Sequence, residues 1–349
     1  MTLPIASDFP PMEARRVDTL PEGPLWQYEP KWDGFRCLAF KDGDAVDLRS
    51  KAGQPFNRYF PEIVEAMQRL RAPQCVLDGE LVVPAGDALS FDELLLRIHP
   101  AASRVRTLAA EHPATYIVFD LVVDGDGRSL VAMPLGERRA ALETFAAEML
   151  RDTRAFRLSP ATADRAEAER WLATVGATLD GVIAKRIDLP YRSGDRIGMQ
   201  KVKRVRAAEC VVGGFRYGSG TRVVGSLLLG LFDDDGLLHH VGFTSNIPRI
   251  ERERLTTQLE ALVEPPGFTG RAPGGPSRWS TERSAEWQPL RPVRVVEIYY
   301  DHFSGGRFRH GTRFMRWRPE KPATQCTFNQ VRDAPASMPS TPSQSTLGI

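Results

Sequence analysis

The sequence predicts an α+β protein in which a larger domain, built on mixed and largely antiparallel sheet, precedes a smaller all-β domain. Short strand-like runs alternate with helix-like segments between Trp26 and about Val205. Two turns rich in Gly and Asp, at 41–44 and 124–127, are typical of hairpins and favour antiparallel pairing over a doubly wound sheet. After about Arg206, short strands joined by Gly- and Asp-rich turns accompany one helical segment, a pattern typical of a small barrel of the OB type.

The individual elements follow from apolar runs, helical spacing and one capping signal. Ser90 followed by Glu93 indicates a capping box at the start of a helix over 91–98. In the larger domain the sequence predicts strands at 36–40, 45–48, 75–83, 115–123 and 181–184, and helices at 60–71 and 136–150. In the smaller domain it predicts strands at 209–215, 226–232, 237–243 and 293–300, and a helix at 249–262.

These elements divide the chain into four parts. Residues 1–25 are rich in Pro and turn formers, so we expect an irregular segment that lies over the first domain. The larger domain is expected at 26–206 and the smaller one at 207–328. The tail 329–349 has too little apolar content to fold, and we expect it to be disordered.

Composition sets broad limits on the protein class. The 349 residues are 42% hydrophobic and 26% charged, which is ordinary for a globular protein. No apolar run is long enough to cross a bilayer and no signal-peptide core is evident at the start, so we expect a cytoplasmic protein. The four cysteines are widely separated, which argues against a zinc site or a disulfide framework.

Positive charge is concentrated near the C-terminal end. Between Arg307 and Lys321 six Lys and Arg residues stand against one acid, Glu320, and aromatic residues are interleaved with them. The net charge of the chain is only +2, so this clustering is more informative than the total. Such a stretch suits a polyphosphate or a nucleic-acid backbone, although a solvated basic strand is the alternative interpretation.

The segment 29–36 (EPKWDGFR) carries the strongest chemical signal. A lysine amine is a poor nucleophile at neutral pH because its pKa is about 10.4, so Lys31 needs neighbours that help it lose a proton. Arg36 could hold a phosphate or sugar as a bidentate donor. Taken alone, this pattern could equally be an exposed hairpin.

Four further segments follow in order along the chain. Each places charge or an aromatic ring at an apolar strand, and the last sets two lysines on one face of a strand. Each by itself is better explained as structure than as a site. The segments are 76–81 (VLDGEL), 116–120 (YIVFD), 179–185 (LDGVIAK) and 199–203 (MQKVK).

Together these motifs resemble the covalent nucleotidyltransferase superfamily, and most closely the ATP-dependent DNA ligases. The resemblance extends from about Trp26 to Lys321 and includes 313–321 (RFMRWRPEK), which resembles the C-terminal motif of the ligases. Chain length and the segments 58–62 and 97–104 resemble the short bacterial ligases of the mycobacterial ligase C type. The resemblance implies an adenylation domain followed by an OB-fold domain, acting as a monomer on nicked duplex DNA, in DNA repair.

The resemblance also implies a role for each site residue. Lys31 is the expected nucleophile that carries AMP, and Lys201 and Lys203 are expected to neutralise the α-phosphate and to lower the pKa of Lys31. The expected cofactors are ATP and a divalent cation, Mg²⁺ or Mn²⁺. The expected metal ligands are Asp33, Glu80 and Asp180, and the other expected nucleotide or phosphate contacts are Glu29, Arg36, Lys51, Glu80, Phe119, Arg196, Arg313, Arg318 and Lys321.

Three positions depart from the family pattern. Lys51 stands where an arginine is usual, which removes a bidentate donor, and Arg49 is a candidate to compensate. Asp180 replaces a more usual Glu, and Glu320 a more usual Asp. These departures affect rate and metal preference more than reaction type.

Other functions remain as alternatives. An RNA ligase or a capping-type guanylyltransferase shares the early motifs, whereas the full ending at 313–321 favours DNA ligase. A non-catalytic binding module is disfavoured by the intact Lys31 and its partners. An NAD-dependent ligase is disfavoured because the chain lacks the cysteine-rich zinc module of those enzymes.

Overall fold

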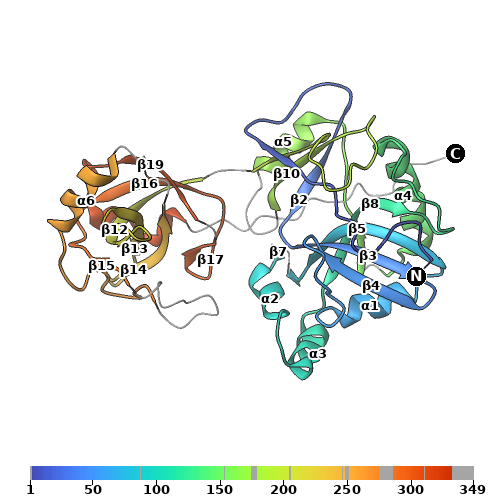
Figure 1. Cartoon of the computed structure of the whole chain (residues 1–349), viewed down its shortest axis with the longest axis horizontal. Helices are drawn as coiled ribbons and strands as arrows, with labels where there is room; N and C mark the ends of the chain where they lie inside the picture. The colour runs from blue at the N-terminus through green and yellow to red at the C-terminus, as the bar shows by residue number, and fades with distance from the viewer. Residues whose placement is uncertain are drawn as a thin grey trace. The chain divides into compact units, whose positions relative to one another are not determined.

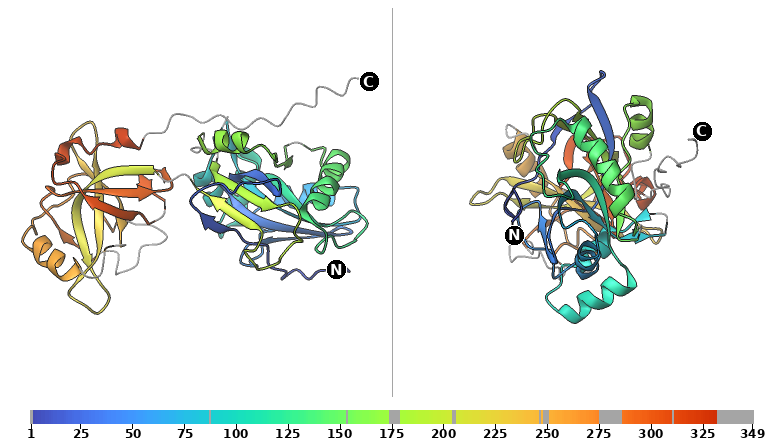
Figure 2. Two further views of the ribbon diagram at one scale, coloured as in Figure 1. Left: turned by 90° about the horizontal axis from the view of Figure 1, so that it is seen from above. Right: turned by 90° about the vertical axis from the view of Figure 1, so that its right-hand side faces the viewer.

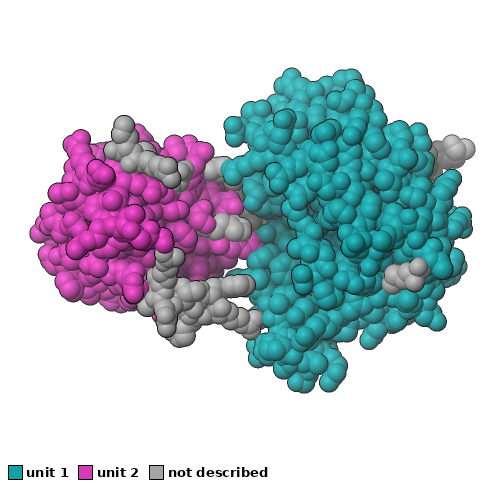
Figure 3. Space-filling model, viewed as in Figure 1, with its two compact units in different colours: residues 1–204, 334–349 teal, residues 205–333 magenta. Residues whose placement is uncertain are grey.

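The computed structural model divides the chain into two compact units, residues 1–204 and residues 205–333 (Figures 1 and 3). It describes residues 2–86, 88–152, 154–173, 179–203, 206–245, 247, 251–274, 286–309 and 311–331. In Figure 2 the strands of the first unit run from blue to yellow-green and those of the second from yellow to red. Each unit has its own hydrophobic core, and each is described separately below.

A five-stranded sheet forms the larger part of the first unit. It is antiparallel except for the pairing of β8 with β9, as the hairpin signals predict. The β3–β4 hairpin turns at Gly43, whose φ of 59° is a conformation that glycine adopts without strain. In order across the sheet, the strands are β4 (Ala45–Ser50), β3 (Phe35–Asp42), β5 (Gln74–Val82), β8 (Thr115–Val123) and β9 (Phe156–Leu158).

Helices supply one side of the core of this sheet. The helix α1 (Pro61–Gln68) contacts β4, and α4 (Leu135–Met149) contacts β8. Ile63 of α1 and Leu142 of α4 are fully buried in the same cluster as the strand residue Leu77. This amphipathic packing confirms both predicted helices. The helix α1 is shorter at each end than the predicted 60–71, and α4 begins and ends one residue before the predicted 136–150.

The predicted cap of α2 (Phe91–Leu96) is present in part. The Glu93 backbone N–H donates to the Ser90 hydroxyl over 3.2 Å, as a capping box requires. The return bond is absent because the Ser90 N–H already donates to the Val83 carbonyl, and the Glu93 carboxylate pairs with His112. The next helix, α3, spans Ala102–Glu111, and the short strands β6 (Pro84–Ala85) and β7 (Ala88–Leu89) pair with each other.

A second, four-stranded sheet completes the first unit. Its strands, in order, are β1 (Arg15–Val17), β11 (Met199–Val202), β10 (Leu179–Arg186) and β2 (Trp26–Trp32). The helix α5 (Arg165–Ala173) covers one face, where Trp171 packs with Tyr28 and Val182. The opposite face of this sheet contributes to the pocket described in the next section.

The N-terminal segment 1–25 is not wholly irregular, contrary to the sequence-based expectation. Residues Arg15–Val17 form β1, which pairs in parallel with Gln200–Val202 of β11. No alternation of polar and apolar residues marks this strand, because two of its three residues are exposed arginines. Its conformation depends on a partner strand far away in the sequence, which local pattern cannot reveal.

The second unit is a β-sheet with one helix, α6 (Arg252–Glu260), packed against β13. Within the described residues, the edge strand β14 approaches the edge strand β19 through an isolated bridge between Thr244 and Thr312, the residue before β19. Among the described residues the sheet is therefore open, and the closed form of the expected barrel is not observed. The strands run β14 (Leu238–Thr244), β13 (Val224–Phe232), β12 (Arg206–Tyr217), β16 (Val295–Tyr300) and β19 (Arg313–Trp317), with β15 (Gln288–Pro289) paired to β12 and a separate hairpin of β17 (Phe303–Ser304) and β18 (Arg307–Phe308).

The end of the second unit is ordered further than expected. Two 3₁₀ helices, Ala323–Gln325 and Phe328–Gln330, follow β19. The Gln330 side chain accepts from the Glu209 N–H over 3.0 Å and donates to its carbonyl over 3.1 Å, so residues 329–331 do not belong to a disordered tail. The remainder of the predicted tail, 332–349, lies outside the described residues. Within the described part of the chain, no helix has both the length and the apolar character to cross a membrane.

Candidate active site

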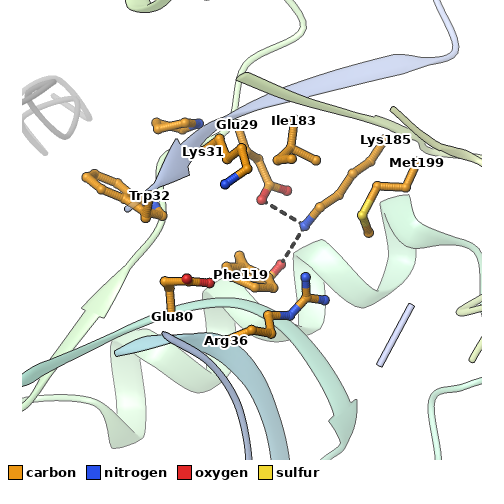
Figure 4. Close-up of a pocket in the computed structure, with 10 residues that line it drawn as sticks. Glu29, Lys31, Trp32, Arg36, Glu80, Phe119, Ile183, Lys185 and Met199 are labelled. Carbon is orange, nitrogen blue, oxygen red and sulfur yellow. Dashed lines mark hydrogen bonds and ion pairs between the residues drawn. The ribbon is translucent and has the colours of Figure 1, made fainter. Parts of the chain in front are cut away.

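A pocket of about 70 Å³ lies between the two sheets of the first unit. Figure 4 shows charged side chains from both sheets converging on it, with the Phe119 ring between them. The four-stranded sheet contributes Glu29, Pro30, Lys31 and Trp32 from β2, Ile183 and Lys185 from β10, and Met199 from β11, while the other sheet contributes Arg36 from β3, Glu80 from β5 and Phe119 from β8.

Strand register determines which side chains reach the pocket. Glu29 pairs with Ile183 and Lys31 with Gly181 across β2 and β10, so alternate residues of both strands share the pocket face. A side chain at Gly181 would place Cβ 2.0 Å from the Val202 carbonyl, and the φ of Gly181 is +142°. Glycine is therefore required beside Asp180, where a bulge interrupts the pairing.

Lys31 is held by a carboxylate. Its ammonium lies 2.6 Å from Asp180, which also pairs with Lys203 over 2.9 Å. Burial opposes the charged form of Lys31, but the negative charges of Asp180 and Glu80 outweigh burial and raise its pKa above the ordinary value. The expectation that nearby cations lower the pKa of Lys31 is therefore wrong for this arrangement, because the carboxylates are closer partners.

Lys201 lies on the pocket face of β11, paired with Ile183. Burial, and then the positive charges of Lys31 and Lys203, lower the pKa of Lys201. The structure thus brings together the three lysines that the sequence places in the site. Neighbouring cations therefore contribute to a lower pKa at Lys201, whereas the sequence-based prediction placed this effect at Lys31.

The predicted metal ligands do not form a ready-made site. The Asp180 carboxylate is engaged by Lys31 and Lys203, and the charge of Asp33 acts on both Lys31 and Glu80. In the part of the chain that the structure describes, no group of three or more Asp, Glu, His or Cys side chains is arranged to hold a metal ion. Of these carboxylates, Asp180 lies directly against the Lys31 ammonium.

Glu80 titrates close to neutrality. Burial raises its pKa to about 7, against the opposing charges of Lys31 and Arg36. A carboxyl group in this state changes charge within the physiological range, so the field around Lys31 depends on pH.

This shift predicts a pH-dependent stability that Glu80→Gln should remove. The folded protein holds a proton on Glu80 up to about pH 7, whereas the ordinary pKa is 4.5. The unfolding free energy of the wild type should therefore fall as pH rises from about 4.5 through 7, and this part of the fall should be absent in Glu80→Gln. Urea unfolding at pH 5 and pH 8 measures the difference, with Glu65→Gln, exposed on α1, as the control for loss of one carboxylate. An unchanged pH dependence in Glu80→Gln would show that Glu80 is not the titrating group.

A buried ion pair that the sequence-based reasoning missed lies on the other side of Phe119. The Lys185 ammonium donates to Glu29 over 2.8 Å and to the Phe119 carbonyl over 3.4 Å, and it lies 4.6 Å from the centre of the Phe119 ring. The side chains of Glu29 and Lys185 are 2% and 5% exposed, so each charge depends on the other for compensation. The sequence could have indicated Lys185, because it stands two residues after Ile183 and therefore on the same face of a buried strand.

Arg36 is held in a second network that the sequence did not reveal. Its guanidinium donates two hydrogen bonds of 2.6 Å to Asp78, which is fully buried and also accepts from the Tyr191 hydroxyl over 2.6 Å. The guanidinium also lies 4.6 Å from the Phe119 ring centre. Arg36 therefore lines the pocket, and Asp78 engages the Nε and one terminal nitrogen of its guanidinium. The sequence could have indicated Asp78, because it is an acid inside a mostly apolar strand of nine residues.

Lys51 and Arg196 lie outside this pocket, and both form ion pairs with the same carboxylate. Glu13 lies 3.0 Å from Lys51 and 2.9 Å from Arg196. Arg49, the candidate to compensate for Lys51, instead pairs with Asp47 over 2.8 Å. Neither Lys51 nor Arg196 is among the residues that line the pocket.

The remaining predicted residues belong to the second unit. Arg318 and Lys321 converge on Glu209, and Arg318 also pairs with Glu297 over 3.1 Å. Arg313 lies over the Tyr299 ring, 5.0 Å from its centre. The C-terminal basic motif is thus partly neutralised within its own unit by acids that lie far from it in the sequence.

Two curated relatives match nearly the whole chain. The chain is 46% identical to DNA ligase C2 of Mycolicibacterium smegmatis, covering 97% of this chain and 98% of the relative. It is 42% identical to DNA ligase C of Mycobacterium tuberculosis, covering 95% and 96%. A solved structure from a study of Lig E DNA ligases has the same fold, with a TM-score of 0.55 at 16% identity over 88% of this chain and 99% of the other.

Family assignments cover most of both units. Residues 11–203, which contain the pocket and Lys31, match the ATP dependent DNA ligase domain. Residues 220–321, which end with the basic motif, match the ATP dependent DNA ligase C terminal region. The chain therefore belongs to the ATP-dependent DNA ligase family.

Proposed function

We propose that this protein is an ATP-dependent DNA ligase that seals nicks between a 5′-phosphate and a 3′-hydroxyl, with Lys31 as the residue that carries AMP. The observation that carries the proposal is the position of Lys31. Its ammonium lies at a pocket that also holds an aromatic ring and a buried ion pair, and two further lysines stand nearby, Lys203 on the shared Asp180 and Lys201 beside Ile183. This arrangement suits a purine nucleotide whose phosphates point toward the lysines.

The reaction consists of three displacements at phosphorus. The Lys31 Nζ releases a proton and attacks the α-phosphate of ATP, so that an N–P bond forms and the P–O bond to pyrophosphate breaks. The 5′-phosphate of the nick then attacks the same phosphorus and takes AMP from Lys31. Finally, the 3′-hydroxyl displaces AMP and forms the phosphodiester bond.

The described side chains support particular roles in these steps. We assign Glu29, Lys185 and Phe119 to the base, since a ring and a buried pair of polar groups can recognise a purine. Asp180 holds the Lys31 ammonium until attack, and Lys201 and Lys203 neutralise charge on the α-phosphate. Arg313, Arg318 and Lys321 are proposed to bind the outer phosphates, on the strength of their residue types and the family motif.

A divalent cation, Mg²⁺ or Mn²⁺, is proposed as a cofactor on the chemistry of Asp33, Glu80 and Asp180. Carboxylate oxygens are the ligands that these ions prefer. Because the described acids form no preassembled cluster, we assign no step of the reaction to the ion.

Covalent labelling by different nucleotides tests the proposed function. The protein is incubated with magnesium and ATP, GTP or NAD, each labelled in the nucleoside monophosphate that would be transferred. We expect covalent label on the protein from ATP alone, since the family uses ATP. Label from GTP would point to a capping-type guanylyltransferase. Label transferred from ATP onto RNA ends but not onto nicked duplex DNA would point to an RNA ligase.

A further inference from the structure

The short strand β1 adds an arginine to the pocket face of the four-stranded sheet. Arg16 pairs with Lys201, Lys201 pairs with Ile183, and Ile183 pairs with Glu29. Residues that pair directly across neighbouring strands point to the same face of the sheet, with strands about 4.8 Å apart. Because Glu29 and Ile183 line the pocket, Lys201 and Arg16 continue the same row toward the sheet edge.

Arg15 points the other way. It pairs with Gln200, which pairs with Ala184 and through it with Tyr28. Tyr28 and Ala184 belong to the hydrophobic cluster that contains Trp171 of α5, on the face opposite the pocket. Arg15 and Arg16 are both exposed and carry the same charge, so they differ mainly in the face they present.

The acids around this row already have cationic partners. Glu29 is engaged by Lys185, Asp180 by Lys31 and Lys203, and Glu13 by Lys51 and Arg196. Within the described residues, neither Lys201 nor Arg16 forms an ion pair or a side-chain hydrogen bond. Two neighbouring cations without a carboxylate form a position that a phosphate group can neutralise, and an arginine fork suits phosphate well.

We propose that Arg16, together with Lys201, binds a phosphate group on the pocket face, as an extension of the nucleotide site formed by β2, β10 and β11. This proposal rests on the proposed function, and it adds a residue from the N-terminal segment to that site. The phosphate could belong to the outer part of ATP or to the DNA backbone beside the nick. Both present the same chemistry, and the experiment separates them.

The test compares Arg16→Gln with Arg15→Gln in the full chain. These substitutions remove the same charge from adjacent exposed positions, so a general effect of net charge is equal in both. In the first arm, the rate of Lys31 adenylation is measured against ATP concentration. If the phosphate belongs to ATP, the concentration for half-maximal rate should rise about tenfold in Arg16→Gln and stay unchanged in Arg15→Gln.

In the second arm, binding of nicked duplex DNA to each protein is measured at several salt concentrations. If the phosphate belongs to DNA, Arg16→Gln should weaken binding and lower the slope of log Kd against log salt by about 1. Arg16→Lys should restore part of either effect, because it keeps the charge but loses the fork.

The possible outcomes separate failure of the Arg16 proposal from failure of the proposed function. An effect of Arg16→Gln in either arm that Arg15→Gln lacks supports the proposal and identifies the source of the phosphate. No effect in both arms, or equal effects of both substitutions, overturns it. Absence of label in the wild type would instead overturn the proposed function, while the DNA-binding arm would still report on Arg16.

Discussion

Lys31→Ala should abolish transfer of AMP from ATP to the protein, with a loss on the order of 10³-fold or more. The substitution removes the nitrogen that forms the N–P bond, and among the pocket residues only Lys185 offers another lysine amine, which is bound to Glu29. Labelled ATP followed by denaturing electrophoresis measures the transfer. Sealing of a nick that already carries AMP should be reduced far less, since that step does not need the Lys31 amine.

Lys31→Arg is the matched control for this experiment. A guanidinium keeps the positive charge opposite Asp180, but its nitrogens stay protonated and do not attack phosphorus. Lys31→Arg should therefore be as inactive as Lys31→Ala in self-adenylation while remaining as stable as the wild type. Label that persists in either variant would show that another residue is the nucleophile.

Lys185→Met should lower the unfolding free energy by about 3–5 kcal/mol, because it leaves the Glu29 carboxylate without its partner in a buried site. The double variant Glu29→Gln/Lys185→Met removes both charges and should recover most of that loss. Urea unfolding of the single and double variants measures the coupling between the two residues.

Activity separates a structural role of this pair from a role in binding. If Glu29 and Lys185 recognise the base, the stable double variant should still need a much higher ATP concentration for adenylation, or should accept GTP as readily as ATP. A double variant with wild-type dependence on ATP would show that the pair stabilises the fold and does not contact the nucleotide.

Much of the fold could be predicted because its signals are local. The strand over Thr115–Val123 was predicted at its observed bounds, since only Thr115 and Asp120 interrupt its apolar run of nine residues. The β3–β4 hairpin followed from the turn chemistry around Gly43. In contrast, β1 was missed because its residues Arg15–Val17 carry no pattern of their own and become a strand only beside β11.

Within the candidate site, the residues that stand in recognisable motifs were easier to predict than their partners. Lys31, Glu80 and Phe119 stand in short motifs, and the structure brings all three to one pocket. The partners of Arg36 and Arg318 are Asp78 and Glu209, which lie 42 and 109 positions away in the sequence. Such pairings depend on how strands are arranged in space, so no local pattern indicates them.

The sequence by itself determined the class of protein, the order of its motifs and the identity of the lysine that is expected to carry AMP. These depend on residue type and on spacing along the chain, which a sequence records directly. Only the tertiary structure decided that Asp180 raises the pKa of Lys31 rather than nearby lysines lowering it, and that Arg16 stands beside Lys201. The physical reason is that proton affinity and phosphate binding depend on distances between charges, and strand pairing sets those distances between residues far apart in the chain.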